Sequence, residues 1–186
     1  MNTSNTKERI LTEAESLIQR KGYNAFSFKD IANAVNIKTA SIHYHFPSKE
    51  DLGVEVIAWH IEKISKALLE ISHDSSLSAR QKLHALLDAV FLMTYNNERK
   101  MCLGGMFASD TQSLPISIQN KARKFFEVIL DWIQQILKNS GYDTASSILF
   151  ARQILSLIEG SLLLARLYGD KNFLEGVRGF IDGSIK

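Results

Sequence analysis

The sequence predicts an all-α protein of about nine helices, with an N-terminal domain over residues 1–47 and a C-terminal domain over residues 48–186. Apolar residues recur three, four and seven positions apart along most of the chain, which is the period of an amphipathic helix. Only two prolines, Pro47 and Pro115, interrupt the 186 residues, so long helices are allowed. Capping signals and glycines fall between the periodic segments, where helices are expected to begin and end.

Composition indicates an ordinary globular protein, with 45% hydrophobic and 23% charged residues. The single cysteine, Cys102, excludes an intramolecular disulfide and favours a reducing compartment. The N-terminus has no apolar signal segment, and no apolar run approaches the roughly 18 residues of a membrane span. We therefore expect a cytoplasmic protein that does not enter a membrane.

The first predicted helix ends at Gly22, with Arg20 and Lys21 in its last turn, where the helix dipole favours positive charge. Its apolar stripe consists of Ile10, Leu11, Ala14, Leu17 and Ile18. A second, short helix is expected to open at the capping box Ser27–Asp30. The face that it buries consists of Phe28, Ile31, Ala32 and Val35.

A tight turn is expected at Asn36, a residue type that tolerates the left-handed conformation. It leads into a third short helix, from about Lys38 to Phe46. Pro47 ends that helix, because the residue before a proline disfavours the helical conformation. A second capping box, Ser48–Asp51, opens a long helix that reaches about Ser72.

Five further helices are expected in the remainder. Ser78 with Gln81 caps one that reaches about Asn97, a short one follows Cys102, one runs from Pro115 to Gly141, Thr144 caps one that reaches about Leu167, and the last covers Asn172 to Ile185. The helix from Thr144 is apolar on more than one side, which predicts two buried faces. We expect one face in the core and one against a second subunit; a central helix of a monomer is the alternative.

Three short helices at the N-terminus, with a brief turn between the second and third, form the layout of a helix-turn-helix domain. At 100° per residue, Ile42 and Phe46 mark the buried side of the third helix. The outward-facing residues are Ala40, Ser41 and Tyr44, with Thr39 and His43 on one flank and His45 on the other. Small residues would let such a helix enter the major groove, and the hydroxyls and rings can contact phosphates or base edges.

Local charge agrees with a polyanionic partner. Five basic residues but a single acidic one, Asp30, lie between Arg20 and Lys49, although the whole chain carries a net charge of only +2. A solvated charged face is the alternative. Lys49 begins the long helix, where its charge adds to that of the helix N-terminus and favours a phosphate.

The histidines of His43-Tyr44-His45 are not expected to form a metal site or a catalytic pair. On a helix, positions i and i+2 point about 200° apart, and neither histidine has a His or Cys three or four positions away. A general base also needs a nucleophile and an orienting carboxylate, and no such set is recognisable. Neither a cofactor nor an enzymatic reaction is implied.

The segment "RILTEAESLIQRKGYNAFSFKDIANAVNIKTASIHYHFPSKEDL", Arg9 to Leu52, resembles the DNA-binding domain of the TetR family of repressors and covers about a quarter of the chain. The resemblance implies that DNA is bound by Ser27, Lys29, Lys38, Thr39, Ala40, Ser41, His43, Tyr44, His45 and Lys49. Three positions depart from the family pattern: Asn36 where the turn glycine is common, Lys38 at the cap of the recognition helix, and His43 where tyrosine is usual.

The same resemblance implies a homodimer whose last two long helices form the interface, and an effector pocket within each C-terminal domain. Candidate effector-binding residues are Phe91, Tyr95, Cys102, Met106, Phe107, Phe125, Phe126, Trp132 and Ile158. Aromatic and Met residues at helical spacing are more often plain core, which is the alternative.

The segment "MCLGGMFASD", Met101 to Asp110, is similar to the Cys-Leu-x-Gly segment of a branch of the family that responds to electrophiles. Cys102 lies near a helix N-terminus with Arg99 and Lys100 upstream, which favours the reactive thiolate. The alternative is a small buried hydrophobic residue.

The sequence thus predicts a dimeric repressor that a small molecule or an electrophile releases from operator DNA. The alternatives are a DNA-binding protein without an effector and a transcriptional activator of the same fold.

Overall fold

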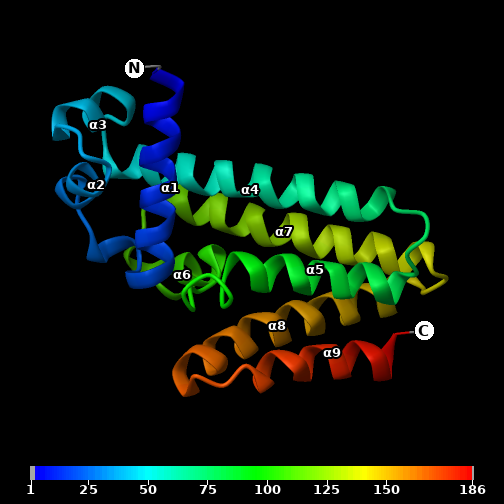
Figure 1. The fold of residues 1–186 in the computed structure, drawn as a ribbon. Coiled ribbons are helices and arrows are strands. Elements are labelled where there is room, and N and C mark those ends of the chain that lie inside the picture. Colours follow the sequence, from blue (N-terminus) through cyan, green and yellow to red (C-terminus); the bar gives the residue numbers. More distant parts are fainter. Residues whose placement is uncertain (1–2, 186) are drawn as a thin grey trace. The chain divides into compact units, whose positions relative to one another are not determined.

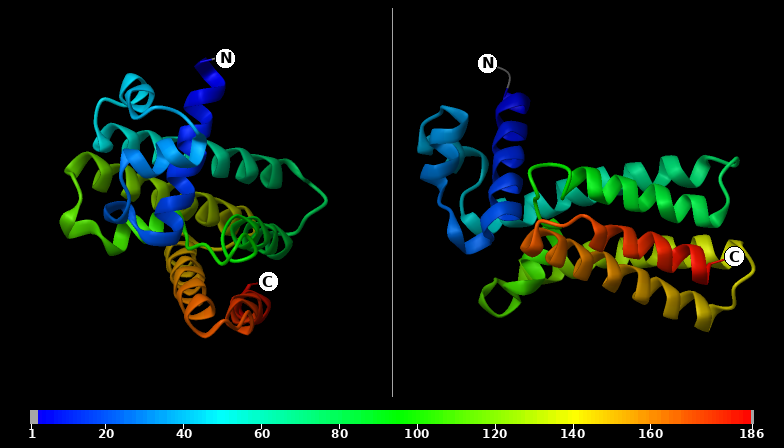
Figure 2. Two further views of the ribbon diagram at one scale, coloured as in Figure 1. Left: turned by 60° about the vertical axis from the view of Figure 1, so that its left-hand side comes forward. Right: turned by 60° about the horizontal axis from the view of Figure 1, so that its bottom comes forward.

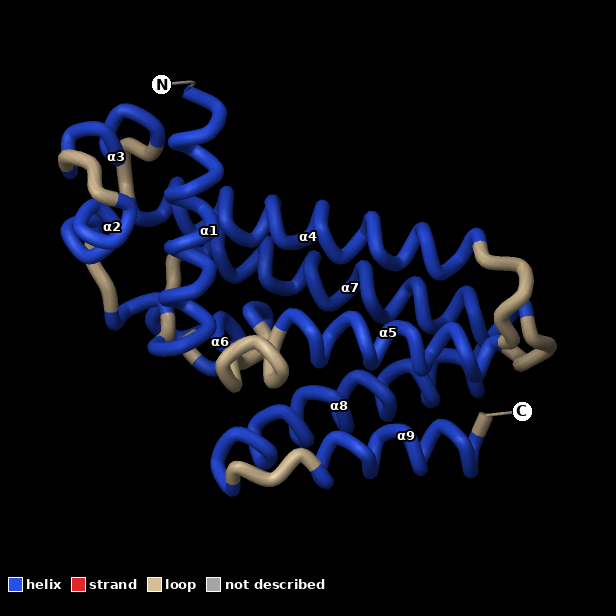
Figure 3. Tube along the Cα trace, in the orientation of Figure 1, coloured by secondary structure: helices blue, strands red, loops and turns tan. Residues whose placement is uncertain are grey.

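The computed structural model describes residues 3–185, which contain nine α-helices, two short 3₁₀-helices and no strand (Figures 1 and 3). The elements are α1 (Thr3–Lys21), η1 (Tyr23–Ala25), α2 (Phe28–Val35), α3 (Thr39–His45), α4 (Lys49–His73), α5 (Ala79–Met93), α6 (Leu103–Ser109), η2 (Thr111–Ser113), α7 (Ile116–Asn139), α8 (Thr144–Tyr168) and α9 (Asn172–Ser184). The predicted all-α class is confirmed.

The chain forms two compact units. The first consists of the chain up to Glu62 together with Leu103–Phe125, and the second consists of Lys63–Cys102 and the chain from Phe126 onward. Helices α4 and α7 therefore each contribute one part to either unit. The domain boundary expected after residue 47 is a functional division and stays a prediction.

In the first unit, α1 packs against α2 and α6, and α2 packs against α3 (Figure 1). Each helix buries most of its predicted apolar stripe, and the core includes Ile10, Ala14, Ile18, Ile31, Val35, Ile42 and Phe46. Leu17 and Phe28, which were expected on the buried faces, are only half-buried. The turn at Asn36 has φ 54° and ψ 55°, and its N–H donates to the carbonyls at the end of α2. The left-handed conformation expected at this residue is confirmed.

One polar pair is buried among these helices. His60 Nδ1 on α4 is hydrogen-bonded to Glu15 Oε1 on α1, and the two residues are only 5% and 7% exposed. The ring of Phe125 lies against His60, with 5.4 Å between the ring centroids. The hydrogen bond offsets part of the cost of removing the two polar groups from water.

Three predicted capping boxes are confirmed. Asp30 Oδ2 accepts the N–H of Ser27 at 2.7 Å, Asp51 Oδ2 accepts that of Ser48 at 3.0 Å, and Ser78 exchanges hydrogen bonds with Gln81. Each box satisfies two backbone N–H groups that a helix N-terminus leaves without partners.

Two predicted helix ends are wrong. Thr144 does not cap α8; the cap is Asp143, whose Oδ1 accepts the N–H of Ser146 at 2.9 Å. A carboxylate is the stronger acceptor at this position. The sequence alone does not decide between Asp143 and Thr144, because both residue types are common caps. The helix expected to reach Asn97 ends at Met93, because Thr94 leaves the helical conformation and turns its hydroxyl back onto the carbonyl of Val90 at 2.6 Å.

In the second unit, α9 packs along α8 and α5 (Figure 2). The core is aliphatic and includes Leu83, Leu87, Ile154, Ile158, Leu162, Val177 and Ile181. The guanidinium of Arg80 donates to the carbonyl of Ile185 at 3.0 Å and 2.5 Å, which holds the end of α9 against the start of α5.

Helix α8 is long and apolar enough to cross a membrane by length and composition alone. The expectation that the chain holds no such segment was therefore too strong. Only 33% of the apolar window is buried within the chain, and several large apolar side chains of α8 are exposed, among them Leu149, Leu163 and Leu167. The predicted cytoplasmic location stays a prediction.

Candidate nucleic-acid interface

The short helix α3 separates buried from exposed residues as its sequence predicts. Ile42 and Phe46 are 0% and 1% exposed, whereas Tyr44 is 78% exposed. Ala40 is exposed and Thr39 and Ser41 are half-buried. The outer face of α3 thus combines small side chains, two hydroxyls and one large aromatic ring.

The first turn of α3 has no side-chain cap. Lys38 occupies the N-cap position in an extended conformation, and its side chain makes no capping hydrogen bond. Backbone N–H groups in the first turn of a helix have no intrahelical acceptor. Lysine is not a capping residue, so its departure from the family pattern leaves this helix N-terminus without a side-chain cap.

The rings of His43 and His45 lie along different sides of α3. His43 lies edge-on to Phe28 on α2, with 4.8 Å between centroids, and its Nδ1 is 3.4 Å from the carbonyl oxygen of Pro47. His45 lies against Tyr44 instead, with 5.1 Å between centroids. The separation expected of positions i and i+2 on a helix is therefore observed.

Ser27 and Lys29 lie at the start of α2, and both are exposed. The hydroxyl of Ser27 donates to Asp30 Oδ2 at 2.7 Å, and the hydrogen bonds from Ser27 keep the pKa of Asp30 below its usual value of 3.8. The carboxylate is therefore ionised at neutral pH. It offsets part of the positive charge that lysines bring to this surface.

Lys49 is the candidate whose side chain points differently from expectation. It is half-buried, and its ammonium lies over the rings of Tyr23 and Phe26 while donating to the carbonyl of Phe26. Neither ring was singled out from the sequence. A Gly-Tyr pair followed three residues later by Phe was the available signal, but nothing local connects it to a lysine more than twenty positions away.

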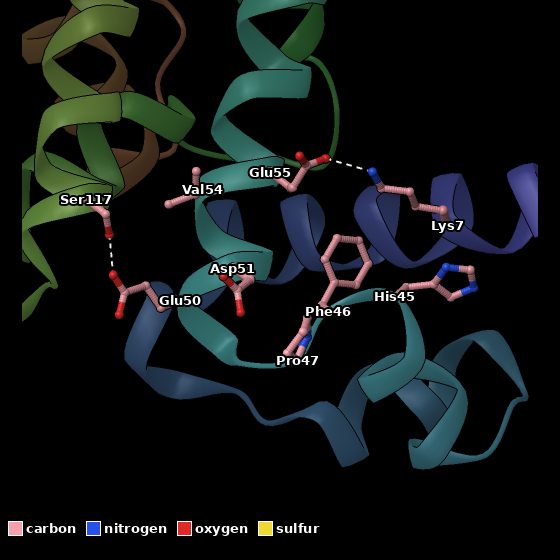
Figure 4. A pocket seen from close by; sticks show the side chains of 9 residues that line it. All are labelled: Lys7, His45, Phe46, Pro47, Glu50, Asp51, Val54, Glu55 and Ser117. Carbon is pink, nitrogen blue, oxygen red and sulfur yellow. Dashed lines mark hydrogen bonds and ion pairs between the residues drawn. The ribbon is translucent and has the colours of Figure 1, made fainter.

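A groove of about 470 Å³ borders α3 at His45 and Phe46 (Figure 4). Its other walls come from α1, the start of α4 and the start of α7, and three of its side chains are acidic: Glu50, Asp51 and Glu55. All three have partners, because Lys7 pairs with Glu55 at 2.9 Å, Ser117 donates to Glu50 at 2.5 Å, and Asp51 caps α4. Because like charges repel, these three carboxylates disfavour a polyanion in the groove and favour the surface of α2 and α3 instead.

The candidate effector-binding residues divide between the two units. Met106, Phe107 and Phe125 belong to the first, where Phe107 lies 5.8 Å from Tyr23 and Phe125 covers His60. The other six belong to the second: Phe91, Tyr95, Cys102, Phe126, Trp132 and Ile158. The indole N–H of Trp132 is already used within that unit, since it donates to the carbonyl of Leu68 at 3.0 Å and to the hydroxyl of Ser72 at 2.7 Å.

Cys102 is buried and lies one residue before α6. Its side chain is hydrogen-bonded to the carboxyl of Glu159 on α8. Burial raises the pKa of Glu159 above its usual value of 4.5, and the hydrogen bond from Cys102 opposes that increase. The sequence could not place these two residues together, because 57 positions separate them.

The first unit therefore defines a helix-turn-helix protein whose third helix exposes small, hydroxyl and aromatic side chains. Residues 10–56 match the model of the bacterial regulatory proteins of the tetR family, and residues 79–179 match the C-terminal domain of LmrA/YxaF-like transcriptional regulators. The chain belongs to the TetR family, and it is a DNA-binding transcriptional regulator.

Relatives agree with this assignment. A crystal structure of a TetR transcriptional regulator from Legionella pneumophila is 68% identical, covers 100% of both chains and has a TM-score of 0.98. A regulator from Lactococcus lactis subsp. lactis, named an uncharacterized HTH-type transcriptional regulator in the lacX 3' region, is 30% identical over 94% of this chain and 90% of its own. IcaR of Staphylococcus aureus, named a negative transcriptional regulator of the biofilm operon icaADBC, is 29% identical over 46% of each chain.

The raised pKa of Glu159 makes a prediction about stability. A carboxyl whose pKa is higher in the folded than in the unfolded protein favours folding when it is protonated, and this contribution is lost as the pH rises above 4.5 and through the folded pKa. Glu159→Gln cannot ionise, so it should be more stable than the parent protein at pH 8, and the gain should shrink toward pH 4. Urea unfolding at fixed protein concentration measures both values.

The exposed carboxylate of Glu70 on α4 provides the control, and Glu70→Gln should leave the pH dependence of stability unchanged. A Glu159→Gln protein that is equally destabilised at both pH values would show that the hydrogen bond from Cys102 matters more than the desolvation of the carboxylate.

Proposed function

We propose that this protein is a homodimeric transcriptional repressor that holds operator DNA with α3 and releases it when an effector binds the second unit. The observation that carries the proposal is the exposed face of α3, on which Tyr44 is 78% exposed while Ile42 and Phe46 fix the helix to the core. The Tyr44 ring lies edge-on against His45 of the same helix and is mostly exposed, so it can meet a base edge. The name of IcaR supports repression, because it describes a negative regulator.

The proposed contacts follow from where the side chains lie. Ala40 and Tyr44 on the outer face of α3, with Thr39 on its flank, would meet base edges as the helix enters the major groove. A second set would meet phosphates, from the start of α2 and from α3 and its N-cap: Ser27, Lys29, Lys38, Ser41, His43 and His45. Phosphate contacts set the register, so sequence preference would depend mainly on Tyr44 and its small neighbours.

Tyr44→Ala should abolish selective binding while leaving the fold unchanged. The side chain makes no buried contact, and one good base contact contributes about 1–3 kcal/mol of discrimination. The measurement is a gel shift against a duplex that the wild-type protein selects from a random library, together with circular dichroism. Lys66→Ala, an exposed residue of the second unit, is the control. Undiminished selectivity of the Tyr44→Ala protein would contradict the proposed role of α3.

Dimerisation is supported by the outer surfaces of α8 and α9. Helix α8 exposes a set of large apolar side chains: Leu149, Leu157, Leu163, Leu164, Leu167 and Tyr168. On α9, Gly176, Gly179 and Gly183 follow one stripe, and a Cβ added at any of them would meet nothing within 4 Å. Glycine lowers the stability of a helix. Three glycines along one stripe of α9, next to the exposed leucines of α8, therefore favour close packing of a second copy against this surface.

The sign of a glycine substitution tests this interface. In a monomer, Gly179→Ala should stabilise α9 by about 0.5–1 kcal/mol, because alanine is the better helix former. In a packed dimer the added methyl should weaken association, by about 1–3 kcal/mol. We expect Gly179→Ala to raise the dissociation constant of the dimer in sedimentation equilibrium, and to raise the melting temperature only after dilution to monomers. Stabilisation at every concentration would exclude α9 from the interface.

Release from DNA is proposed as a population shift. An effector acts only if it binds the DNA-incompetent arrangement of the dimer better than the competent one, and the two recognition helices must be about 34 Å apart to meet successive turns of one groove. A small molecule is the leading candidate. The aromatic and aliphatic candidates of the second unit suit an apolar ligand.

An electrophile acting through Cys102 is the second candidate effector. Its thiol is buried and hydrogen-bonded to Glu159, whereas reactive cysteines are partly exposed and surrounded by positive charge. We expect Cys102 to be alkylated by iodoacetamide more slowly in the folded than in the urea-unfolded protein, as measured by mass spectrometry. Rapid alkylation of the folded protein that also lowers DNA affinity, and that Cys102→Ser abolishes, would favour the electrophile instead.

A further inference from the structure

The imidazole of His43 is exposed and uses one of its two nitrogens within the chain. Nδ1 lies 3.4 Å from the carbonyl oxygen of Pro47, and the ring stands edge-on to Phe28 with 4.8 Å between centroids. A carbonyl oxygen only accepts hydrogen bonds, so this contact requires a proton on Nδ1. Within residues 3–185 the other nitrogen, Nε2, has no hydrogen-bond partner, and it is therefore available to a ligand.

The contact with Pro47 decides what Nε2 can do in each charge state of the ring. A neutral imidazole carries a single proton, and with that proton on Nδ1, Nε2 is an acceptor. A phosphate oxygen is also an acceptor, so the neutral ring cannot donate to it while the contact with Pro47 is kept. Protonation adds an N–H at Nε2 together with a positive charge, and both favour a phosphate.

Charged groups surround His43 on the neighbouring elements. They are Lys7 and Arg9 on α1, Lys29 and Asp30 on α2, Lys38 and His45 at the two ends of α3, and Lys49, Glu50 and Asp51 in the first turn of α4. The three carboxylates have other partners, since Asp30 accepts from Ser27, Asp51 from Ser48 and Glu50 from Ser117. In the part of the chain that the structure describes, no carboxylate pairs with His43, which leaves its positive charge for DNA.

His45 lies on the same helix in different surroundings. Its ring lies against Tyr44, with 5.1 Å between centroids, and it borders the groove that contains the acidic side chains (Figure 4). Among the described residues, no hydrogen bond determines which of its nitrogens carries the proton. A neutral His45 can therefore direct an N–H outward, which makes it the natural comparison for His43.

We propose that DNA binding by this protein is coupled to protonation of His43, which meets a phosphate only as the imidazolium. The proposal rests on the proposed function, because it concerns how α3 holds operator DNA. Binding then takes up a proton at this residue. Affinity therefore rises as the pH falls through roughly pH 8 to pH 5, the range in which histidines change charge, and levels off once the free imidazole is itself protonated. Acidification thus strengthens operator binding.

Two substitutions separate the charge of His43 from its ring. His43→Phe and His43→Tyr both keep an aromatic ring beside Phe28, but phenylalanine has no donor and tyrosine has a neutral hydroxyl that donates throughout this pH range. Binding to the selected duplex is measured by fluorescence anisotropy at about pH 6 and about pH 8 and at one ionic strength, with circular dichroism at each pH as a check of the fold.

We expect the wild-type protein to bind about tenfold more tightly at about pH 6 than at about pH 8. Both variants should lose this dependence on pH, and His43→Tyr should bind more tightly than His43→Phe at either pH. His45→Phe is the matched control, and it should keep the increase in affinity at low pH, whatever its affinity at high pH. An unchanged wild-type affinity, or the same increase in His43→Phe, would overturn the proposal.

Salt dependence provides a readout that a general effect of pH on the fold would not reproduce. Each protonated histidine that meets a phosphate steepens the slope of log affinity against log salt by about 0.9. The wild-type slope should therefore be steeper at about pH 6 than at about pH 8, whereas His43→Phe should have one slope at both pH values. Equal wild-type slopes at the two pH values would show that His43 gains no phosphate contact on protonation.

A third measurement does not depend on DNA. The distance of 3.4 Å is long for a hydrogen bond, so the tautomer needs direct observation. Nitrogen-15 NMR of the histidine side chains, assigned with the His43→Phe variant, should show the proton of His43 on Nδ1 at about pH 8. A proton mainly on Nε2 would let the neutral ring donate to a phosphate, and would also overturn the proposal. If the wild-type protein selects no duplex at either pH, the proposed function fails, and the NMR spectra alone still decide whether His43 has the required tautomer.

Discussion

The presentation of α3 depends on two buried side chains. A helix of seven residues is far too short to persist alone in water, so its conformation comes from burying Ile42 and Phe46 against the rest of the first unit. The left-handed Asn36 on one side and Pro47 on the other limit the helix to that length. Every candidate contact on α3 is therefore a consequence of packing, since its outer residues contribute little to holding the helix in place.

Features that depend on neighbours in sequence could be predicted. The faces of α3 follow from a fixed angle per residue, and the three capping boxes follow from residues three apart. The all-α class and the helix-turn-helix also follow from such local patterns. The family resemblance then assigned roles to the exposed residues, and the positions of Tyr44 and Ala40 on one exposed face are compatible with those roles.

Features that join distant parts of the chain could not be predicted. The ammonium of Lys49 contacts the rings of Tyr23 and Phe26, which lie more than twenty residues earlier in the chain. It also donates to the carbonyl oxygen of Phe26, and such a contact has no signature in the sequence. The contact between Cys102 and Glu159 likewise depends on how α8 packs. The prediction of the cap of α8 was wrong for a different reason. Asp143 and Thr144 are both good capping residues, and only the backbone conformation decides between them.

The buried pair of Glu15 and His60 has a consequence for how the family diverges. Removing either partner takes this hydrogen bond from the other, buried group, at a cost of about 1–3 kcal/mol, whereas replacing both with apolar residues of the same shape can be nearly neutral. Drift at position 15 is therefore constrained by the residue at position 60, although the two are 45 positions apart. Among close relatives these positions should change together or not at all, and Phe125, which covers the imidazole, should limit the size of any apolar replacement.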